Sequence, residues 1–105
     1  MMNSQIVKFH VGQIIEHKKF GYRGVIYDVD AEFSGTDVWY EHVAKSRPPK
    51  DEPWYHVLVD ASDATTYVSE QNILTTENTS EINHPLVELY FLNYSNDRYN
   101  LTLKQ

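Results

Sequence analysis

Two short stretches rich in aromatic and β-branched residues, 20–30 and 53–60, constrain the fold of this chain more than any other feature. Residues of these types fit the pleated, half-buried surface of a sheet, so each stretch predicts a β-strand. Charged and aromatic side chains stand beside the apolar ones in both stretches, which indicates a small sheet with a surface for contact. Neither stretch carries a catalytic signature. A binding module is therefore the leading interpretation.

The length of 105 residues predicts a single domain over residues 1–105, with its core at about 8–92 and a loosely ordered tail at 93–105. Eight tyrosines, four phenylalanines and two tryptophans supply large side chains that help a small sheet to close a core. No run approaches the roughly 20 apolar residues that cross a bilayer, and residues 1–5 lack the features of a signal peptide. The absence of cysteine suits a reducing compartment. We therefore expect a soluble, cytoplasmic protein.

The net charge of −6 argues against constitutive binding of nucleic acid, because contacts between cations and phosphates normally supply most of the affinity. The positive charges are nevertheless grouped in two parts of the chain. The grouped basic residues are Lys8, Lys18, Lys19 and Arg23, followed by Lys45, Arg47 and Lys50. Two interpretations stay open: a basic patch on an acidic body, or a mixed and solvated surface.

Alternation, turn residues and helix caps predict the order of elements along the chain. The expected strands are 11–16, 22–30, 54–60, 65–68 and 73–74, and the expected helices are 37–44, capped by Ser34 or Thr36, and one within 84–91 that carries Pro85 in its first turn. Residues 75–83 are polar and without periodicity, which indicates a loop. The fold class is mainly β: a small, antiparallel, partly open SH3-like barrel with one inserted short helix and one C-terminal short helix.

Alternation also assigns side chains to the faces of the elements. The second expected strand has Val25, Tyr27 and Val29 on one face, the better core candidate, and Ile26, Asp28 and Asp30 on the other. The third has Trp54, His56 and Leu58 on one face and Tyr55, Val57 and Val59 on the other. The helix 37–44 carries Val38, Trp39 and Val43 on one stripe.

Several spaced segments follow one another in an order that is specific to one family. They are residues 11–17, 20–30, 53–59 and 66–72, followed by the pairs 84–85, 90–91 and 98–99. With these segments the chain resembles, from about residue 8 to residue 99, the heat-shock protein HspQ family, also called YccV-like or hemimethylated-DNA-binding. It departs from the pattern at Ala31, where members often carry proline, and this change should loosen a loop more than alter function.

The resemblance implies a small β fold without enzymatic activity or cofactor, and self-association with a trimer as the suggested form. It also implies two alternative roles. In the first, the protein is a heat-shock accessory factor that promotes the degradation of selected or denatured proteins by the ATP-dependent protease Lon. In the second, it is a DNA-binding regulator that recognises hemimethylated DNA near replication origins. The family provides no agreed binding residues that could be transferred to this chain.

Contact residues are therefore inferred from the sequence itself. The candidates for contact with a partner protein or with DNA are Lys18, Lys19, Tyr22, Arg23, Lys45, Arg47, Lys50, Trp54 and His56. The turn at residues 18–23 is the leading part of this surface. For Trp54 and His56 we favour the alternative that both faces of their strand are covered, one by the core and one by the helix 37–44, because large aromatic side chains in small domains are usually buried.

No catalytic or metal site is predicted. Asp28, Asp30 and His56 could meet across paired strands and bind a divalent metal, but their spacing matches no metal motif. Aspartates at the end of a strand more often accept hydrogen bonds in a turn. The other histidines are dispersed, and the sequence has neither a nucleophile elbow nor a glycine-rich phosphate loop.

Overall fold

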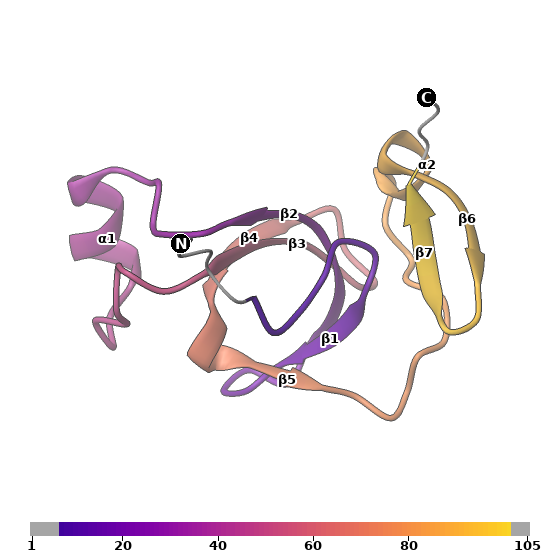
Figure 1. The fold of residues 1–105 in the computed structure, drawn as a ribbon, viewed down its shortest axis with the longest axis horizontal. Helices are drawn as coiled ribbons and strands as arrows, with labels where there is room; N and C mark the ends of the chain where they lie inside the picture. The colour runs from indigo at the N-terminus through magenta and orange to yellow at the C-terminus, as the bar shows by residue number, and fades with distance from the viewer. Residues whose placement is uncertain (1–6, 102–105) are drawn as a thin grey trace, which may run out of the picture.

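The computed structural model of the chain describes residues 7–101, which are built mainly of β-strands (Figure 1). In chain order the elements are β1 (Ile14–His17), β2 (Arg23–Asp30), α1 (Asp37–Val43), β3 (Trp54–Val59), β4 (Thr65–Ser69), the 3-10 helix η1 (Glu70–Asn72), β5 (Ile73–Thr75), α2 (Val87–Tyr90), β6 (Phe91–Ser95) and β7 (Arg98–Leu101). Five strands form one sheet in the order β4-β3-β2-β1-β5, and β6 pairs with β7. All pairs are antiparallel. The predicted mainly β fold with an inserted and a C-terminal short helix is confirmed.

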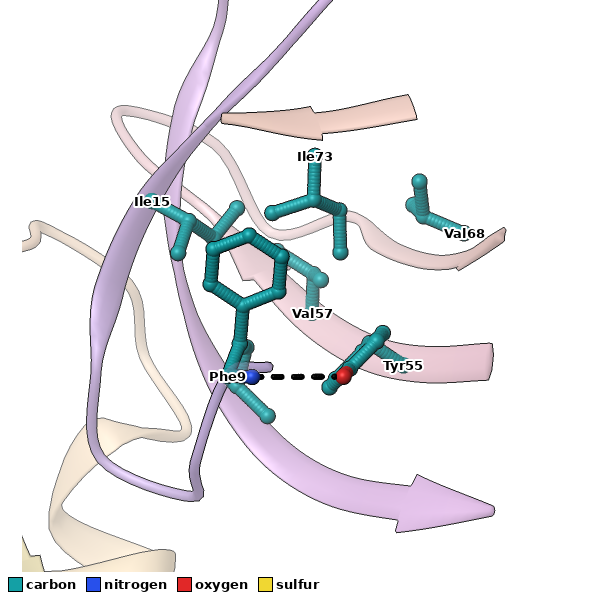
Figure 2. Close-up of a cluster of buried hydrophobic side chains, with 7 residues drawn as sticks. Phe9, Ile15, Tyr55, Val57, Val68 and Ile73 are labelled. Atoms are coloured by element: carbon teal, nitrogen blue, oxygen red, sulfur yellow. Dashed lines mark hydrogen bonds between the residues drawn. The ribbon is translucent and has the colours of Figure 1, made fainter. Parts of the chain in front are cut away.

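Strand β2 lies in the middle of the five-stranded sheet and carries core residues on both of its faces. The inner cluster draws on every strand of this sheet and fills the barrel; it consists of Phe9, Ile15, Ile26, Tyr55, Val57, Val68 and Ile73 (Figure 2). The outer cluster joins Ile14, Val25 and Leu58 of the sheet to Ile82, Phe91 and Tyr99 of the C-terminal part. The β6–β7 hairpin therefore packs against the outer face of the barrel (Figure 1).

The expected face assignment in β2 is wrong at two points: Ile26, on the face not favoured for the core, is fully buried in the inner cluster, and Val29 lies on the opposite face from Val25 and Tyr27. The register between β2 and β3 shifts between Ile26 and Asp28. Val25 and Tyr27 pack with the outer cluster, as alternation predicts. Val29, however, packs with Ile26 against the inner cluster. A β-bulge re-aims the side chains that follow it, and strict alternation does not anticipate this change.

Strand β1 begins at Ile14, later than expected, because Gly12 forms a turn in front of it. Gly12 has a φ of +91°. Its N–H donates to the carbonyl of Ile26, and its own carbonyl accepts a hydrogen bond from the N–H of Tyr99. This turn therefore links the barrel to the C-terminal hairpin through backbone hydrogen bonds.

Residues 93–101, expected as part of a loosely ordered tail, form most of the β6–β7 hairpin. Asn96 and Asp97 both have positive φ, as in the tight turns that join antiparallel strands. The ring of Tyr99 is buried in the outer cluster, and its hydroxyl accepts a hydrogen bond of 2.8 Å from the N–H of Ile82. Burial of a few aromatic rings thus orders a segment whose composition is polar. Residues 102–105 of the expected tail lie outside the described residues.

Helix α1 begins at Asp37, as expected, and Thr36 is its N-cap, because the Thr36 hydroxyl accepts a hydrogen bond of 3.1 Å from the N–H of Trp39. The expected apolar stripe is not the buried face, since Val38 and Val43 are 70% and 55% exposed. The helix instead buries Tyr40 and half-buries Trp39. Within residues 7–101, no helix is long and apolar enough to cross a membrane.

Candidate functional site

A groove of about 510 Å³ runs beside strand β4. We call it the β4 groove. One wall is formed by His17, Lys19, Phe20 and Tyr22, and the other by Trp39, Val43, Ala44, Lys45, Ser46 and Pro48. All five residues of β4 line it, together with Tyr27, Trp54, His56 and Asn72. The groove therefore lies between the β1–β2 turn and the segment that ends helix α1.

The β1–β2 turn is organised by the buried side chain of His17. Its Nδ1 accepts hydrogen bonds from the N–H groups of Lys19 and Phe20, at 3.0 and 3.1 Å. Burial, reinforced by the nearby ammonium of Lys19, lowers the pKa of His17, which keeps the ring neutral and able to accept these bonds. Phe20 stacks on His17 at a centroid distance of 4.7 Å but stays 76% exposed. The turn thus holds an aromatic ring out into solvent.

Tyr22 connects this turn to β4. Its hydroxyl lies 2.8 Å from the Thr66 Oγ1, at hydrogen-bond distance. This bond joins the β1–β2 turn to the edge strand β4. Tyr22 therefore links two of the segments that line the groove.

The opposite wall rests on packed aromatic rings: Phe33, Trp39, Tyr40, Trp54 and Tyr67. The ring of Trp54 packs edge-on against Phe33 at 5.0 Å and Trp39 at 6.1 Å. Its Nε1 donates to the carbonyl of Pro49, so its polar group is satisfied. Trp54 is 1% exposed, as a covered face predicts, whereas the side chain of His56 on the same face is 31% exposed.

His56 joins a polar network at one end of the groove. The His56 Nε2 lies 3.0 Å from the Asp30 Oδ2, and the same oxygen accepts a hydrogen bond of 2.7 Å from the Tyr67 hydroxyl. Burial opposes ionisation of Asp30, but the hydrogen bonds from Tyr67 and His56 outweigh it and lower the pKa of this carboxyl. Burial and the bond to Asp30 raise the pKa of Tyr67 to about 12.

The bulge in β2 places Asp28 opposite His56 in the ladder. As the sequence suggested, Asp28, Asp30 and His56 come together, with possible ligand atoms within 4.8 Å of one another. His56 and Asp30 already bond to each other, and the Asp28 Oδ1 accepts a hydrogen bond from the N–H of Val29. The Asp28 carboxylate therefore accepts a backbone hydrogen bond within strand β2, next to the bulge, and not in a turn.

The basic residues predicted as contacts divide into two sets. Three are paired with carboxylates: Arg23 with Asp60 at 2.9 Å, Arg47 with Glu41 at 2.8 Å and Lys50 with Asp37 at 3.4 Å. Lys19 and Lys45 lie on opposite walls of the β4 groove, and neither forms an ion pair within the described part of the chain. Lys18 belongs to the same turn as Lys19 but does not line the groove.

Arg23 has a structural role that its place in the predicted contact turn does not suggest. Besides Asp60, its guanidinium donates to the carbonyls of Asn78 and Ser80, each at 2.9 Å. It therefore holds the loop that leads from β5 to the C-terminal part. The structure brings together Lys19, Tyr22, Lys45, Trp54 and His56 of the predicted contacts, and it places Lys18, Arg23, Arg47 and Lys50 outside the groove.

Several groove residues were missed as contact candidates, above all Phe20, Val43 and Tyr67. A phenylalanine between lysine and glycine in a turn is a usable signal, because little in a tight turn can cover its ring. Val43 and Tyr67 give no such signal. Their position depends on how α1 folds back over the sheet, which local sequence does not encode.

Fold and groove together define a small β-barrel domain that presents a partly aromatic, cation-lined surface. The chain matches the family model described as hemimethylated DNA-binding protein YccV like over residues 7–98. It therefore belongs to the YccV-like, or HspQ, family. The resemblance seen in the sequence is confirmed by this match.

Proposed function

We propose that this protein is a non-enzymatic heat-shock accessory factor of the cytoplasm that promotes the degradation of selected or denatured proteins by a Lon-type protease. The observation that carries the proposal is the β4 groove, which combines the exposed ring of Phe20 and the exposed side chain of Val43 with two lysines that form no ion pair within residues 7–101. Exposed apolar side chains next to an aromatic wall suit a segment of unfolded polypeptide, which offers apolar side chains to bury.

The polar groups around the groove support binding rather than catalysis. His17 accepts two backbone hydrogen bonds and is kept neutral by burial. His56 and Tyr67 both bond to Asp30. General acid–base catalysis needs a group that is free to transfer a proton to a substrate. These side chains instead hold the turn and the wall in place.

A direct test adds the purified chain to a Lon-type protease with a chemically unfolded protein as substrate. We expect faster degradation, and we expect Phe20→Ser to reduce the stimulation by roughly threefold or more, because it removes an exposed contact. Lys18→Ala is the matched control, since Lys18 lies in the same turn outside the groove. Unchanged degradation in the presence of the wild-type chain would contradict the proposal.

Binding of hemimethylated DNA is the second candidate function, favoured by the description of the family and by the cluster of Lys18 and Lys19 with Lys45 across the groove. The charges of the chain argue against this second function. Three of the seven grouped cations are neutralised by carboxylates, and the net charge of the chain is −6. Phosphate contacts need free cations, so the structure supports this function less than binding of polypeptide.

Gel-shift titrations with hemimethylated, fully methylated and unmethylated duplexes decide this candidate. Preference for the hemimethylated duplex that persists as salt increases would establish it, because non-specific binding to phosphates weakens steeply with salt. Equal binding of the three duplexes, or none, would exclude it.

A further inference from the structure

Strand β4 has one edge without a partner strand. It is the first strand in the sheet order β4-β3-β2-β1-β5, and within residues 7–101 it pairs only with β3. At the two ends of this ladder, Val59 N–H donates to the carbonyl of Ala64, and Glu70 N–H donates to the carbonyl of Pro53. Paired residues in an antiparallel ladder alternate between bonded and non-bonded positions. The register therefore leaves Thr65, Tyr67 and Ser69 as the non-bonded residues of β4.

The N–H and C=O groups of non-bonded residues point away from the partner strand. In β4 the backbone groups of Thr65 and Tyr67, and the N–H of Ser69, thus face the open edge. Among the described residues, Thr65 and Tyr67 form no backbone hydrogen bond there, whereas the Ser69 carbonyl, at the N-cap of η1, accepts the first hydrogen bond of that helix. An exposed edge of this kind is a template for another strand.

The β4 groove lies along this edge. Side chains of a strand alternate between its faces, so a cavity over one face would touch every second residue. All five residues of β4 line the groove instead. This continuous lining is what a channel along the edge of a strand requires.

A buried hydroxyl in the groove also lacks a partner. Ser69, the last residue of β4, is 1% exposed, and its Oγ has no hydrogen-bond partner among the described residues. Leaving such a group unsatisfied is unfavourable, whereas a ligand with polar backbone groups can bond to it. Ser69 thus provides, independently of the shape of the groove, an unmet hydrogen-bonding group at the end of β4 that favours a polar occupant.

The charge of the groove lining indicates which kind of polypeptide segment would bind there. Its lining includes Lys19 on one wall and Lys45 on the other, and among the described residues it contains no aspartate or glutamate. This is a cationic strip in a chain whose net charge is −6. Phe20 and Val43 stand beside the two lysines and are exposed. Acidic side chains that alternate with apolar ones match this arrangement, because an extended segment presents the two kinds to opposite sides.

We propose that the β4 groove binds an extended polypeptide segment with alternating apolar and acidic side chains, which adds to the sheet as a strand along β4. This inference rests on the proposed function, and it specifies how the recognised segment is held. Backbone hydrogen bonds to Thr65 and Tyr67 supply affinity that does not depend on sequence. The side chains near Lys19 and Lys45 supply selectivity. Addition of a strand to a sheet edge is an established mode of peptide recognition.

The first test uses the purified chain without protease and a fluorescein-labelled peptide of about ten residues in which valine and glutamate alternate. Two further peptides are N-methylated at alternate residues, so that each has one edge blocked. We expect one methylated peptide to bind roughly tenfold or more weakly than the other, because several hydrogen bonds to β4 are lost. Equal affinities of the two, or no binding of the unmodified peptide, would overturn the inference.

The second test changes the protein instead of the peptide, at the same edge of β4. Thr65→Pro removes an outward N–H without touching the ladder to β3, and proline is tolerated at such positions of edge strands. Thr65→Val is the matched control, since it also loses the hydroxyl but keeps the N–H. We expect the proline variant to bind the peptide roughly tenfold more weakly than the valine variant, with circular dichroism unchanged.

Two other occupants of the edge give different results in the same experiments. If Thr65→Pro dissociates an oligomer and the peptide does not bind, β4 pairs with a second copy of the chain, and the inference is wrong. If a duplex DNA displaces the peptide from the wild type, the groove binds phosphates and the inference is wrong. If a valine–lysine peptide binds better than the valine–glutamate one, the charge assignment is wrong. Peptide binding without stimulation of the protease would contradict only the proposed function, which keeps the two failures apart.

Discussion

Gly12 and Gly21 both have positive φ, +91° and +74°, but their surroundings differ. A Cβ on Gly12 would lie 2.1 Å from the carbonyl oxygen of Tyr99, whereas a Cβ on Gly21 would meet nothing within 4 Å. A substitution at Gly21 therefore measures the cost of the backbone conformation alone. A substitution at Gly12 measures this cost together with that of a steric clash.

We expect Gly21→Ala to lower the free energy of unfolding by about 1–2 kcal/mol, the usual cost of a left-handed conformation. Gly12→Ala should cost at least about 1 kcal/mol more, because the hairpin must also move away. Denaturation with urea measures both changes. Equal costs would show that the contact between Gly12 and Tyr99 is not tight.

Asp30 makes the free energy of unfolding depend on pH in the acidic range. Since hydrogen bonds from Tyr67 and His56 lower its pKa, its contribution is complete above the ordinary value of 3.8 and is lost as the pH falls through the lowered value. We expect Asp30→Asn to be less stable than the wild type at about pH 6 but to lose less stability below about pH 4. Thermal unfolding across this range measures the difference. Parallel pH profiles of the two proteins would exclude the effect.

At the scale of elements, the Tyr99 hydroxyl ties the C-terminal hairpin to Ile82 inside an apolar cluster. The Tyr99 hydroxyl accepts the N–H of the buried residue Ile82. Tyr99→Phe keeps the ring but leaves this N–H unpaired, so we expect a loss of about 1–3 kcal/mol in the free energy of unfolding. Leu101→Ala, at an exposed position of the same strand, is the control and should cost no more than about 0.5 kcal/mol.

The elements differ in how far the sequence predicts them. Strands β3 and β4 and the cap of α1 follow from local patterns, because alternation and a threonine before the helix act within a few residues. The hairpin of residues 91–101 was missed because its stability comes from Phe91 and Tyr99, which pack against strands distant in sequence. The bulge after Ile26 was missed for a related reason, since it depends on how β2 meets β3.

Some residues of the groove are predictable from local sequence, and others are placed there only by the tertiary fold. Lys19 and Tyr22 were found because a turn between two strands presents its side chains in sequence order. Val43 and Tyr67 became neighbours of that turn only through the curl of the sheet and the path of α1. Three cations that the sequence suggested as contacts are instead paired with carboxylates, and these partners could not be assigned from the sequence. The pairs are Arg23 with Asp60, Arg47 with Glu41 and Lys50 with Asp37.

At the scale of the whole molecule, self-association remains a proposal that the surface of the C-terminal part supports. Leu89, Leu92 and Leu101 of this part are 66%, 68% and 53% exposed. Exposed apolar side chains gathered on one structural unit often mark a surface for another copy of the chain.

We expect Leu92→Glu to shift the protein toward the monomer in size-exclusion chromatography with light scattering, because the charge would have to be buried in the interface. Val38→Glu serves as the control, since Val38 is equally exposed but lies on helix α1. A mass that is the same for wild type and Leu92→Glu would place the contact elsewhere or show that the chain is monomeric.

The alternation of bonded and non-bonded residues along β4 also predicts how fast its amide protons exchange with solvent. The N–H groups of Thr66 and Val68 belong to bonded positions of the ladder, whereas those of Thr65 and Tyr67 face the open edge. Amide protons exchange with solvent slowly where they are bonded and quickly where they are not. Exchange along this strand should therefore alternate residue by residue between slow and fast, and a bound segment should slow the fast positions and remove the alternation.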